Sequence, residues 1–181
     1  MRTRAFIVIA VAALALAGCG DRNLVLKVDV LSYLEASQRT YNVETVPAVG
    51  VEGEIPVLDI PISLIDGLDE AAEVKSVTLS LGGGVTVASG AGSAHLKLYL
   101  SEVGAPSRAL VMDVPVTFAE GVPAVIDATT AGSQEVARLF TQKNLQLKVV
   151  LDQVNITSTV TDMTVTFTKL DAIVVAGRKA F

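Results

Sequence analysis

The chain of 181 residues has no tryptophan, one histidine and one cysteine. The single histidine, His95, excludes a metal site built from several imidazoles, and no serine or cysteine stands with it in a recognisable nucleophile motif. His95, Lys97 and Tyr99 are alternate residues and would lie on the same face of a β-strand. We therefore expect His95 to be a surface histidine on a polar face. Sugars stack on exposed aromatic rings, and with aromatics at 4% of the chain glycan binding is a minor alternative. We therefore expect no enzyme activity and no cofactor.

Basic residues are the smaller charged class, with 14 Lys and Arg against 19 Asp and Glu. Nucleic acids and anionic lipid surfaces attract proteins through patches of positive charge. The acidic balance therefore argues against a nucleic-acid partner and against purely electrostatic binding to a membrane.

The N-terminus has the composition of an export signal. Arg2 and Arg4 form a short positive segment, residues 5–17 are an unbroken apolar run, and small residues precede Cys19. A transmembrane anchor is the alternative, but a spanning helix needs roughly 20 apolar residues and this run is shorter. The pattern predicts a secretory signal peptide.

The segment Leu16-Ala17-Gly18-Cys19 resembles the lipobox of bacterial lipoproteins. The resemblance implies cleavage between Gly18 and Cys19, a diacylglycerol on the Cys19 thiol and acylation of the new amino group. One acyl chain holds a protein only marginally, whereas two give stable attachment. Residues 1–18 are then a signal peptide that is removed, which leaves 12 basic against 19 acidic residues, a formal charge of −7.

A short tether follows the expected lipidation site. Residues 19–23 join the lipid to the first alternating residue, Leu24, and at about 3.3 to 3.6 Å per extended residue they reach roughly 15 Å. We therefore expect the domain to lie close to the bilayer. In lipoproteins an Asp directly after the cysteine favours the inner membrane; Asp21 comes one place later, so the resemblance favours the outer membrane. The sequence does not decide whether the domain faces the periplasm or the outside of the cell.

From residue 24 onward the sequence alternates apolar and polar residues many times, which predicts half-buried β-strands. Val and Thr are abundant, and both suit a pleated surface. The alternating sets are Leu24, Leu26, Val28 and Val30; Val77, Leu79 and Leu81; Leu96, Leu98 and Leu100; Leu110, Met112, Val114, Val116 and Phe118; Leu145, Leu147, Val149 and Leu151; and Met163, Val165 and Phe167.

Turn signals separate these runs at residues 82–84, 89–93, 102–107 and 120–123. One short helix is expected near 133–142, with Ser133 as N-cap and Val136 among its apolar residues. Many short strands with regular turns predict an all-β, antiparallel β-sandwich, Ig-like or jelly-roll-like, as a single domain over 24–181.

Three prolines and one irregular segment refine this prediction. Pro56, Pro61 and Pro115 cannot donate a ladder hydrogen bond, so we expect their strands at sheet edges. Alternation weakens around residues 169–171, where we expect a β-bulge. Residues 35–54 have no clear period, and an irregular strand, a long surface loop and disorder all remain open.

Two clusters are candidate ligand sites. Residues 82–84 are three glycines, but a phosphate loop would continue with Gly-Lys-Ser/Thr and a helix, so we expect a hairpin turn there. Asp66, Asp69 and Glu70 surround Gly67, and their oxygens suit calcium, although the spacing does not fit an EF-hand. We expect a solvated acidic turn, with a calcium site as the alternative.

The leading functional interpretation is a lipid-anchored, non-catalytic envelope protein with a binding or structural role near the membrane. Its partners are the membrane, through the lipid on Cys19, and an unknown envelope protein. A carrier of a hydrophobic ligand is the alternative, since 51% of the chain is hydrophobic, but it needs a cavity or groove. A hydrolase is a third possibility, for which the sequence offers no motif.

Overall fold

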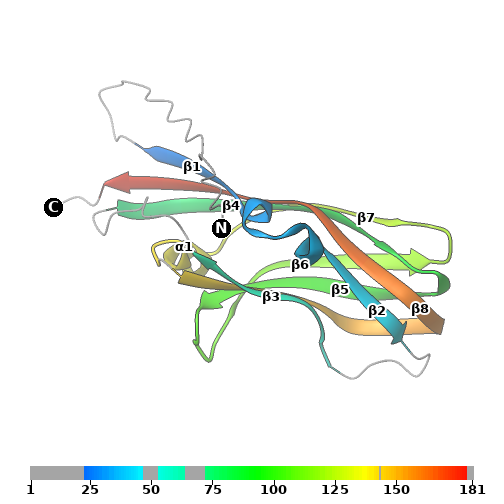
Figure 1. Cartoon of the computed structure of the whole chain (residues 1–181). Helices are drawn as coiled ribbons and strands as arrows, with labels where there is room; N and C mark the ends of the chain where they lie inside the picture. The colour runs from blue at the N-terminus through cyan, green and yellow to red at the C-terminus, as the bar shows by residue number, and fades with distance from the viewer. Residues whose placement is uncertain (1–22, 47–52, 64–71, 143, 179–181) are drawn as a thin grey trace, which may run out of the picture.

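The structure is a computed structural model, and it describes residues 23–46, 53–63, 72–142 and 144–178. Most of these residues belong to antiparallel β-strands, and one short α-helix accompanies them. The prediction of an all-β, antiparallel, sandwich-like fold is confirmed. The eight strands form one continuous sheet that curls until two layers face each other (Figure 1).

The strands in chain order are β1 (Leu24–Asp29), β2 (Thr40–Val46), β3 (Ile55–Ser63), β4 (Ala72–Thr86), β5 (Ser89–Glu102), β6 (Ala109–Ala119), β7 (Ala124–Ala131) and β8 (Asn144–Arg178). Two 3₁₀ turns, η1 (Val30–Tyr33) and η2 (Ala36–Arg39), lie between β1 and β2, and the helix α1 (Gln134–Leu139) lies between β7 and β8. Together, η2 and β2 show that residues 36–46 take regular structure, so the strand alternative holds for 40–46.

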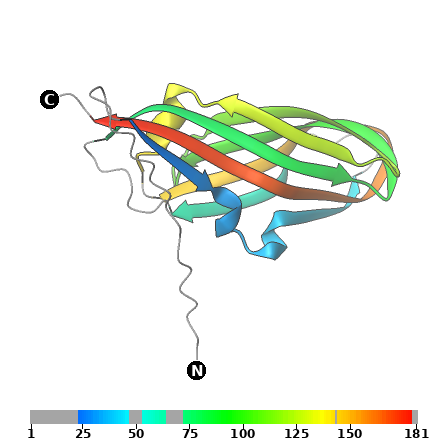
Figure 2. The same ribbon diagram turned by 90° about the horizontal axis from the view of Figure 1, so that it is seen from above.

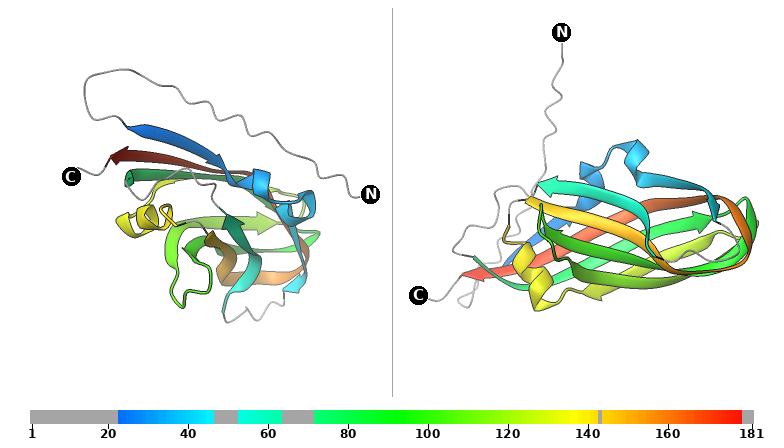
Figure 3. Two further views of the ribbon diagram at one scale, coloured as in Figure 1. Left: turned by 60° about the vertical axis from the view of Figure 1, so that its left-hand side comes forward. Right: turned by 90° about the horizontal axis from the view of Figure 1, so that it is seen from below.

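The long strand β8 belongs to both layers. Its first part pairs with β3 on one side and β5 on the other, and its last part pairs with β4 on one side and with β1 and β2 on the other. Gln153 and Asp162 have positive φ, of 51° and 48°, and lie in the stretch where the strand turns over from one layer to the next. Seen from above, one layer runs β7, β4, β8, β1 (Figure 2). The view from below shows the layer of β3, β8 and β5 (Figure 3).

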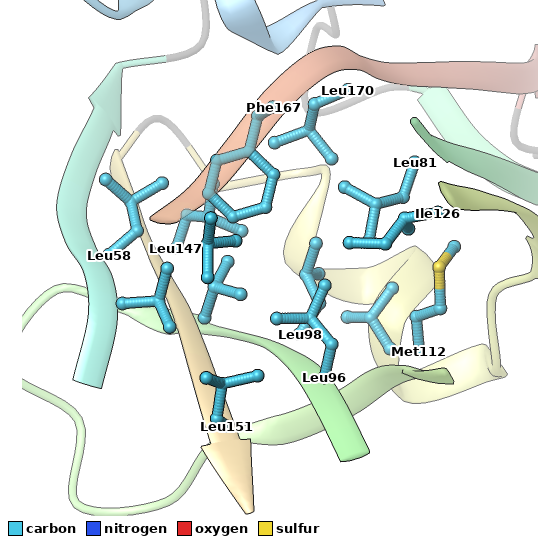
Figure 4. Close-up of a cluster of buried hydrophobic side chains, with 14 of the residues drawn as sticks. Leu58, Leu81, Leu96, Leu98, Met112, Ile126, Leu147, Leu151, Phe167 and Leu170 are labelled. Atoms are coloured by element: carbon cyan, nitrogen blue, oxygen red, sulfur yellow. The ribbon is translucent and has the colours of Figure 1, made fainter. Parts of the chain in front are cut away.

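The core between the layers is aliphatic. Leu81, Leu96, Leu98 and Val149 are fully buried, and among the described residues no polar or charged residue is buried. The close-up of the core shows side chains from β3, β4, β5, β6, β7 and β8 meeting in one cluster (Figure 4). Burying a Leu or Val side chain stabilises a fold by about 1.5–3 kcal/mol. A core of this kind needs no disulfide to hold the layers together.

The helix α1 lies within the range 133–142 that the sequence predicted, and it closes one end of the core. The hydroxyl oxygen of Ser133 accepts a hydrogen bond from the backbone N–H of Val136, which is the expected N-cap. Val136 and Phe140 are buried, and α1 packs against β4, β5 and β6. Its position at the end of the layers is clear in the two views of Figure 3.

The glycine run corrects one prediction. Gly82, Gly83 and Gly84 do not form a hairpin turn; they lie inside β4 and pair with β7 and β8. A Cβ at Gly83 would overlap the carbonyl oxygen of Thr166, so only glycine lets the two backbones come this close. Residues 89–93, also expected as a turn, form the start of β5, while the turns near 102–107 and 120–123 are present.

The strand pairing tests the predicted edge strands and the predicted bulge. Among the described strands, β3 pairs only with β8 and β6 pairs only with β5, so the strands of Pro56, Pro61 and Pro115 are edge strands there, as expected. A bulge in β8 falls at Thr168, because Gly82 pairs with Lys169 and Gly83 with Phe167. It lies one residue before the expected segment, where the glycines of β4 allow the close approach.

Candidate functional site

A groove separates the facing edges of β6 and β7. The two strands are consecutive and are joined by residues 120–123, with a bridge between Ala119 and Val122 beside the turn. Beyond this bridge they separate, because β6 pairs with β5 in one layer and β7 with β4 in the other (Figure 1). The resulting groove has a volume of about 390 Å³ and is lined by residues 110–115 of β6 and 128–130 of β7.

Both walls of the groove are strand edges. The described pairing gives β6 one partner and β7 one partner, so the second edge of each strand faces the groove. Half of the backbone N–H and C=O groups of such a strand point away from its partner and are available for further pairing. Pro115 removes one donor from this set. The groove therefore offers two partial ladders of backbone hydrogen-bonding groups.

A β-bulge in β6 shapes the end of the groove and corrects the sequence prediction. Leu98 pairs with Met112 and Tyr99 with Leu110, which leaves Val111 as an extra residue without a partner on β5. The bulge reverses which side chains of β6 face the core at this point. Val111 is therefore buried, with 7% of its surface exposed, while Leu110 is 47% exposed. The prediction that Leu110 faces the core was wrong, and Leu110 lines the groove instead.

The side chains around the groove divide into two sets. Met112 of β6 and Ile126 of β7 point into the core, where Figure 4 shows both. Asp113 of β6 and, on β7, Asp127 and Thr129 have the opposite parity and are exposed. The inner side of the groove is therefore apolar. On the outer side, the carboxylate of Asp113 lines the groove, and Asp127 is exposed on β7 next to the lining residues 128–130.

Asp113 connects the groove to a polar face. Nδ1 of His95 donates a hydrogen bond to Oδ1 of Asp113 at 2.6 Å, and both side chains are 37% exposed. His95, Lys97 and Tyr99 occupy alternate positions of β5 with partial exposure, which confirms the polar face expected from their parity. In the described part of the chain, no serine, threonine or cysteine side chain forms a hydrogen bond with His95 or Asp113. A carboxylate–imidazole pair alone does not make a catalytic site.

An ion pair lies next along the same face. Nζ of Lys97 donates to Oδ2 of Asp152 at 2.5 Å, and the backbone N–H of Gln153 donates to Oδ1 of the same carboxylate at 2.8 Å. The hydrogen bond from Lys97 is the main reason that the pKa of Asp152 lies below its ordinary value. The same bond holds the pKa of Lys97 above its ordinary value. Each group stabilises the charged form of the other.

At the far end of this face, Glu54 forms ion pairs with two basic residues. Its carboxylate accepts hydrogen bonds from Arg108 and from Nζ of Lys148, the latter at 3.5 Å, and the bond from Arg108 is the largest cause of its lowered pKa. The guanidinium of Arg108 also lies over the ring of Tyr99, 4.3 Å from its centroid. These contacts tie the segment after β5 and the residue before β3 to the sheet, so the charges here have a structural role.

The residues singled out from the sequence lie mostly elsewhere. Gly18 and Cys19, and the carboxylates Asp66, Asp69 and Glu70, fall outside the described residues. Within the described ranges, no cluster of three or more His, Cys, Asp or Glu side chains could hold a metal ion. No helix in the part of the chain that the structure describes is long and apolar enough to cross a membrane.

The core contains an apolar void of about 20 Å³, lined by side chains that include Leu79, Leu98 and Phe140. A void of this volume has room for about one water molecule and is far smaller than a lipid tail. It offers no support for the carrier alternative.

Comparisons with known proteins add little. No family model and no curated protein sequence matches the chain. Among solved structures, the Gx strain of infectious bursal disease virus is similar at 14% identity and a TM-score of 0.39, over 97% of this chain and 42% of that chain. The Gt strain of the same virus is similar at 14% identity and a TM-score of 0.37, over 97% of this chain and 43% of that chain. The chain thus spans less than half the length of these viral chains, and at this level the likeness carries no argument about function.

Proposed function

We propose that this protein is a lipid-anchored, non-catalytic component of a bacterial cell envelope, attached through Cys19, whose β-sandwich binds a partner close to the membrane. The outer membrane is the favoured site. The observation that carries the binding role is the groove between β6 and β7, where two strand edges that have no second partner among the described strands face each other. The lipobox at residues 16–19 supports the anchor.

The arrangement of charges supports a binding role over a catalytic one. The carboxylates of Glu54 and Asp152 have lowered pKa values because each accepts hydrogen bonds from basic side chains or the backbone. Carboxylates that act as general acids need the opposite shift, which comes from desolvation without a cationic partner. These groups therefore stabilise the sheet and remain ionised.

The anchor can be tested by replacing the lipidated residue. Cys19→Ala removes the thiol, so the full chain should no longer incorporate radiolabelled palmitate and should move from the membrane fraction to the soluble fraction. Asn23→Ala in the tether is the matched control and should stay in the membrane fraction, with the label retained. Membrane retention of the Cys19→Ala protein would reject lipid anchoring through this residue.

A further inference from the structure

The groove between β6 and β7 has the form of a vacant strand position. It runs between the turn at residues 120–123 and the helix α1, along residues 110–115 of β6. Six residues of β6 at about 3.3 Å each give a length of roughly 20 Å, and the three residues 128–130 of β7 give roughly 10 Å. An extended peptide of about six residues could therefore pair with β6 along its length and with β7 over about three residues. A compact small molecule would use neither ladder of backbone groups along these edges.

The side chains beside the groove specify what such a peptide must carry. Successive residues of a strand point to opposite faces, so alternate residues of an inserted peptide would face the core side and the solvent side. On the core side they would meet the partly buried Val114 and Ala128, which favour small apolar residues. On the solvent side they would lie between Asp113 of β6 and Asp127 of β7, which favours Lys or Arg.

Asp127 strengthens the case for a cationic occupant. Its side chain is exposed, and in the described part of the chain it has neither a hydrogen bond nor an ion pair, whereas Asp113 is bonded to His95. Glu120 adds a further exposed carboxylate at the turn. With Asp113 in the lining and Asp127 and Glu120 exposed beside it, the outer side of the groove is complementary to positive charge.

A second copy of this chain fits the groove less well. The chain is acidic, with a formal net charge of −5, so two copies repel each other. The free edge of β6 brings Asp113 and Pro115, which would place a carboxylate against carboxylates and remove a donor. These features disfavour pairing between identical edges.

From these observations we propose that the groove binds an extended protein segment by β-strand addition, and that this segment alternates small apolar residues with Lys or Arg. The proposal rests on the binding role proposed above and names the class of its partner. Backbone pairing along both edges supplies affinity, and the alternation of apolar and basic side chains supplies specificity. Pro115, which has no N–H donor, and the bulge at Val111 interrupt the free edge of β6 and so limit backbone pairing with segments that lack this pattern.

The test uses the full chain in a neutral detergent and a fluorescent heptapeptide of alternating Lys and Val. The matched control peptide has the same composition with all Lys residues before all Val residues. Fluorescence anisotropy should show the alternating peptide binding about tenfold more tightly or better. Amide hydrogen exchange should slow in β6 and β7 when it binds.

Two variants separate the groove from general charge attraction. Asp127→Lys reverses a charge beside the groove and should weaken binding of the alternating peptide about fivefold, at the upper end of what an exposed ion pair supplies. Glu44→Lys makes the same change on the exposed edge strand β2 and should leave binding unchanged. Circular dichroism and a melting curve verify that both variants remain folded.

Several results would overturn the proposal. They are the absence of binding, equal binding of the two peptides, exchange protection outside β6 and β7, or equal weakening by the two variants. Self-association seen by light scattering, with protection of the same strands, would identify a second copy as the occupant instead. Membrane release by Cys19→Ala does not depend on the peptide, so loss of this proposal and loss of the anchored role would be distinguishable.

Discussion

Lys97 of β5 and Asp152 of β8 form an ion pair across neighbouring strands, with Nζ 2.5 Å from Oδ2. The side chains are 13% and 25% exposed, so water screens the pair only in part. Because the pKa of Asp152 is lowered and that of Lys97 is raised, the folded state favours the charged form of both groups. The pair therefore makes the stability of the fold depend on pH in two ranges, one acidic and one basic.

Replacing the lysine should reveal this linkage. The contribution of Asp152 is complete above about pH 4, the ordinary pKa of a carboxyl, and is lost as the pH falls through its lowered pKa. The contribution of Lys97 is complete below about pH 10 and is lost as the pH rises through its raised pKa. Lys97→Met should therefore lower the melting temperature between these limits, and the difference from the wild type should shrink beyond both. Thermal melts from pH 3 to 11 measure it.

Lys27→Met is the matched control for this change. Lys27 pairs with Asp171 at 3.2 Å across β1 and β8, but its side chain is 66% exposed. An exposed pair of this kind contributes little, so the control should have a smaller effect on the melting temperature. A pH-independent effect of Lys97→Met would contradict the role assigned to the ion pair.

The glycines of β4 give a second prediction. A methyl group at Gly83 would overlap the backbone of Thr166, and backbone atoms cannot move aside as a flexible side chain can. Gly83→Ala should therefore lower the free energy of unfolding by about 1–3 kcal/mol, the usual cost of overpacking. At Gly84 the added Cβ would lie 3.1 Å from the carbonyl oxygen of Ala124, so Gly84→Ala should cost less. Urea unfolding of both variants tests the order, and equal losses would contradict it.

The acidic segment gives a third prediction, which follows from the sequence. Asp66, Asp69 and Glu70 have a spacing that does not match a calcium loop. We expect EDTA to leave the melting temperature of the full chain unchanged, because a structural metal site would couple metal loss to unfolding. A large decrease in melting temperature that calcium reverses would identify these residues as a calcium site.

Alternation predicted strands such as β5, in which one face is buried, but it did not identify β7 (Ala124–Ala131). Leu96, Leu98 and Leu100 are buried as the period of two requires, and Ser133 caps α1 as its position predicts. The prediction of a turn at residues 82–84 was wrong because glycine occurs both in turns and where two backbones come close together. Only the position of the partner strand distinguishes the two cases.

The groove could not be predicted in the same way. It depends on which strands lie at the edges and on how far consecutive strands separate, and both are properties of strands distant in sequence. Pro115 was the one local signal, since it placed β6 at an edge. The bulge at Val111 gave no signal, because residues 109–112 are all apolar and fit either parity.

The bulge in β6 provides the sharpest test of the structure against the sequence pattern. Strict alternation places Leu110 in the core and Val111 outside, whereas the pairing with β5 does the reverse. Removing the buried side chain should therefore cost more, although it is the smaller one. We expect Val111→Ala to lower the free energy of unfolding by about 1–3 kcal/mol, and Leu110→Ala to change it by about 0.5 kcal/mol or less. Urea unfolding of the two variants measures both values; a larger loss for Leu110→Ala would mean that β6 keeps a regular alternation and that Leu110 does not line the groove.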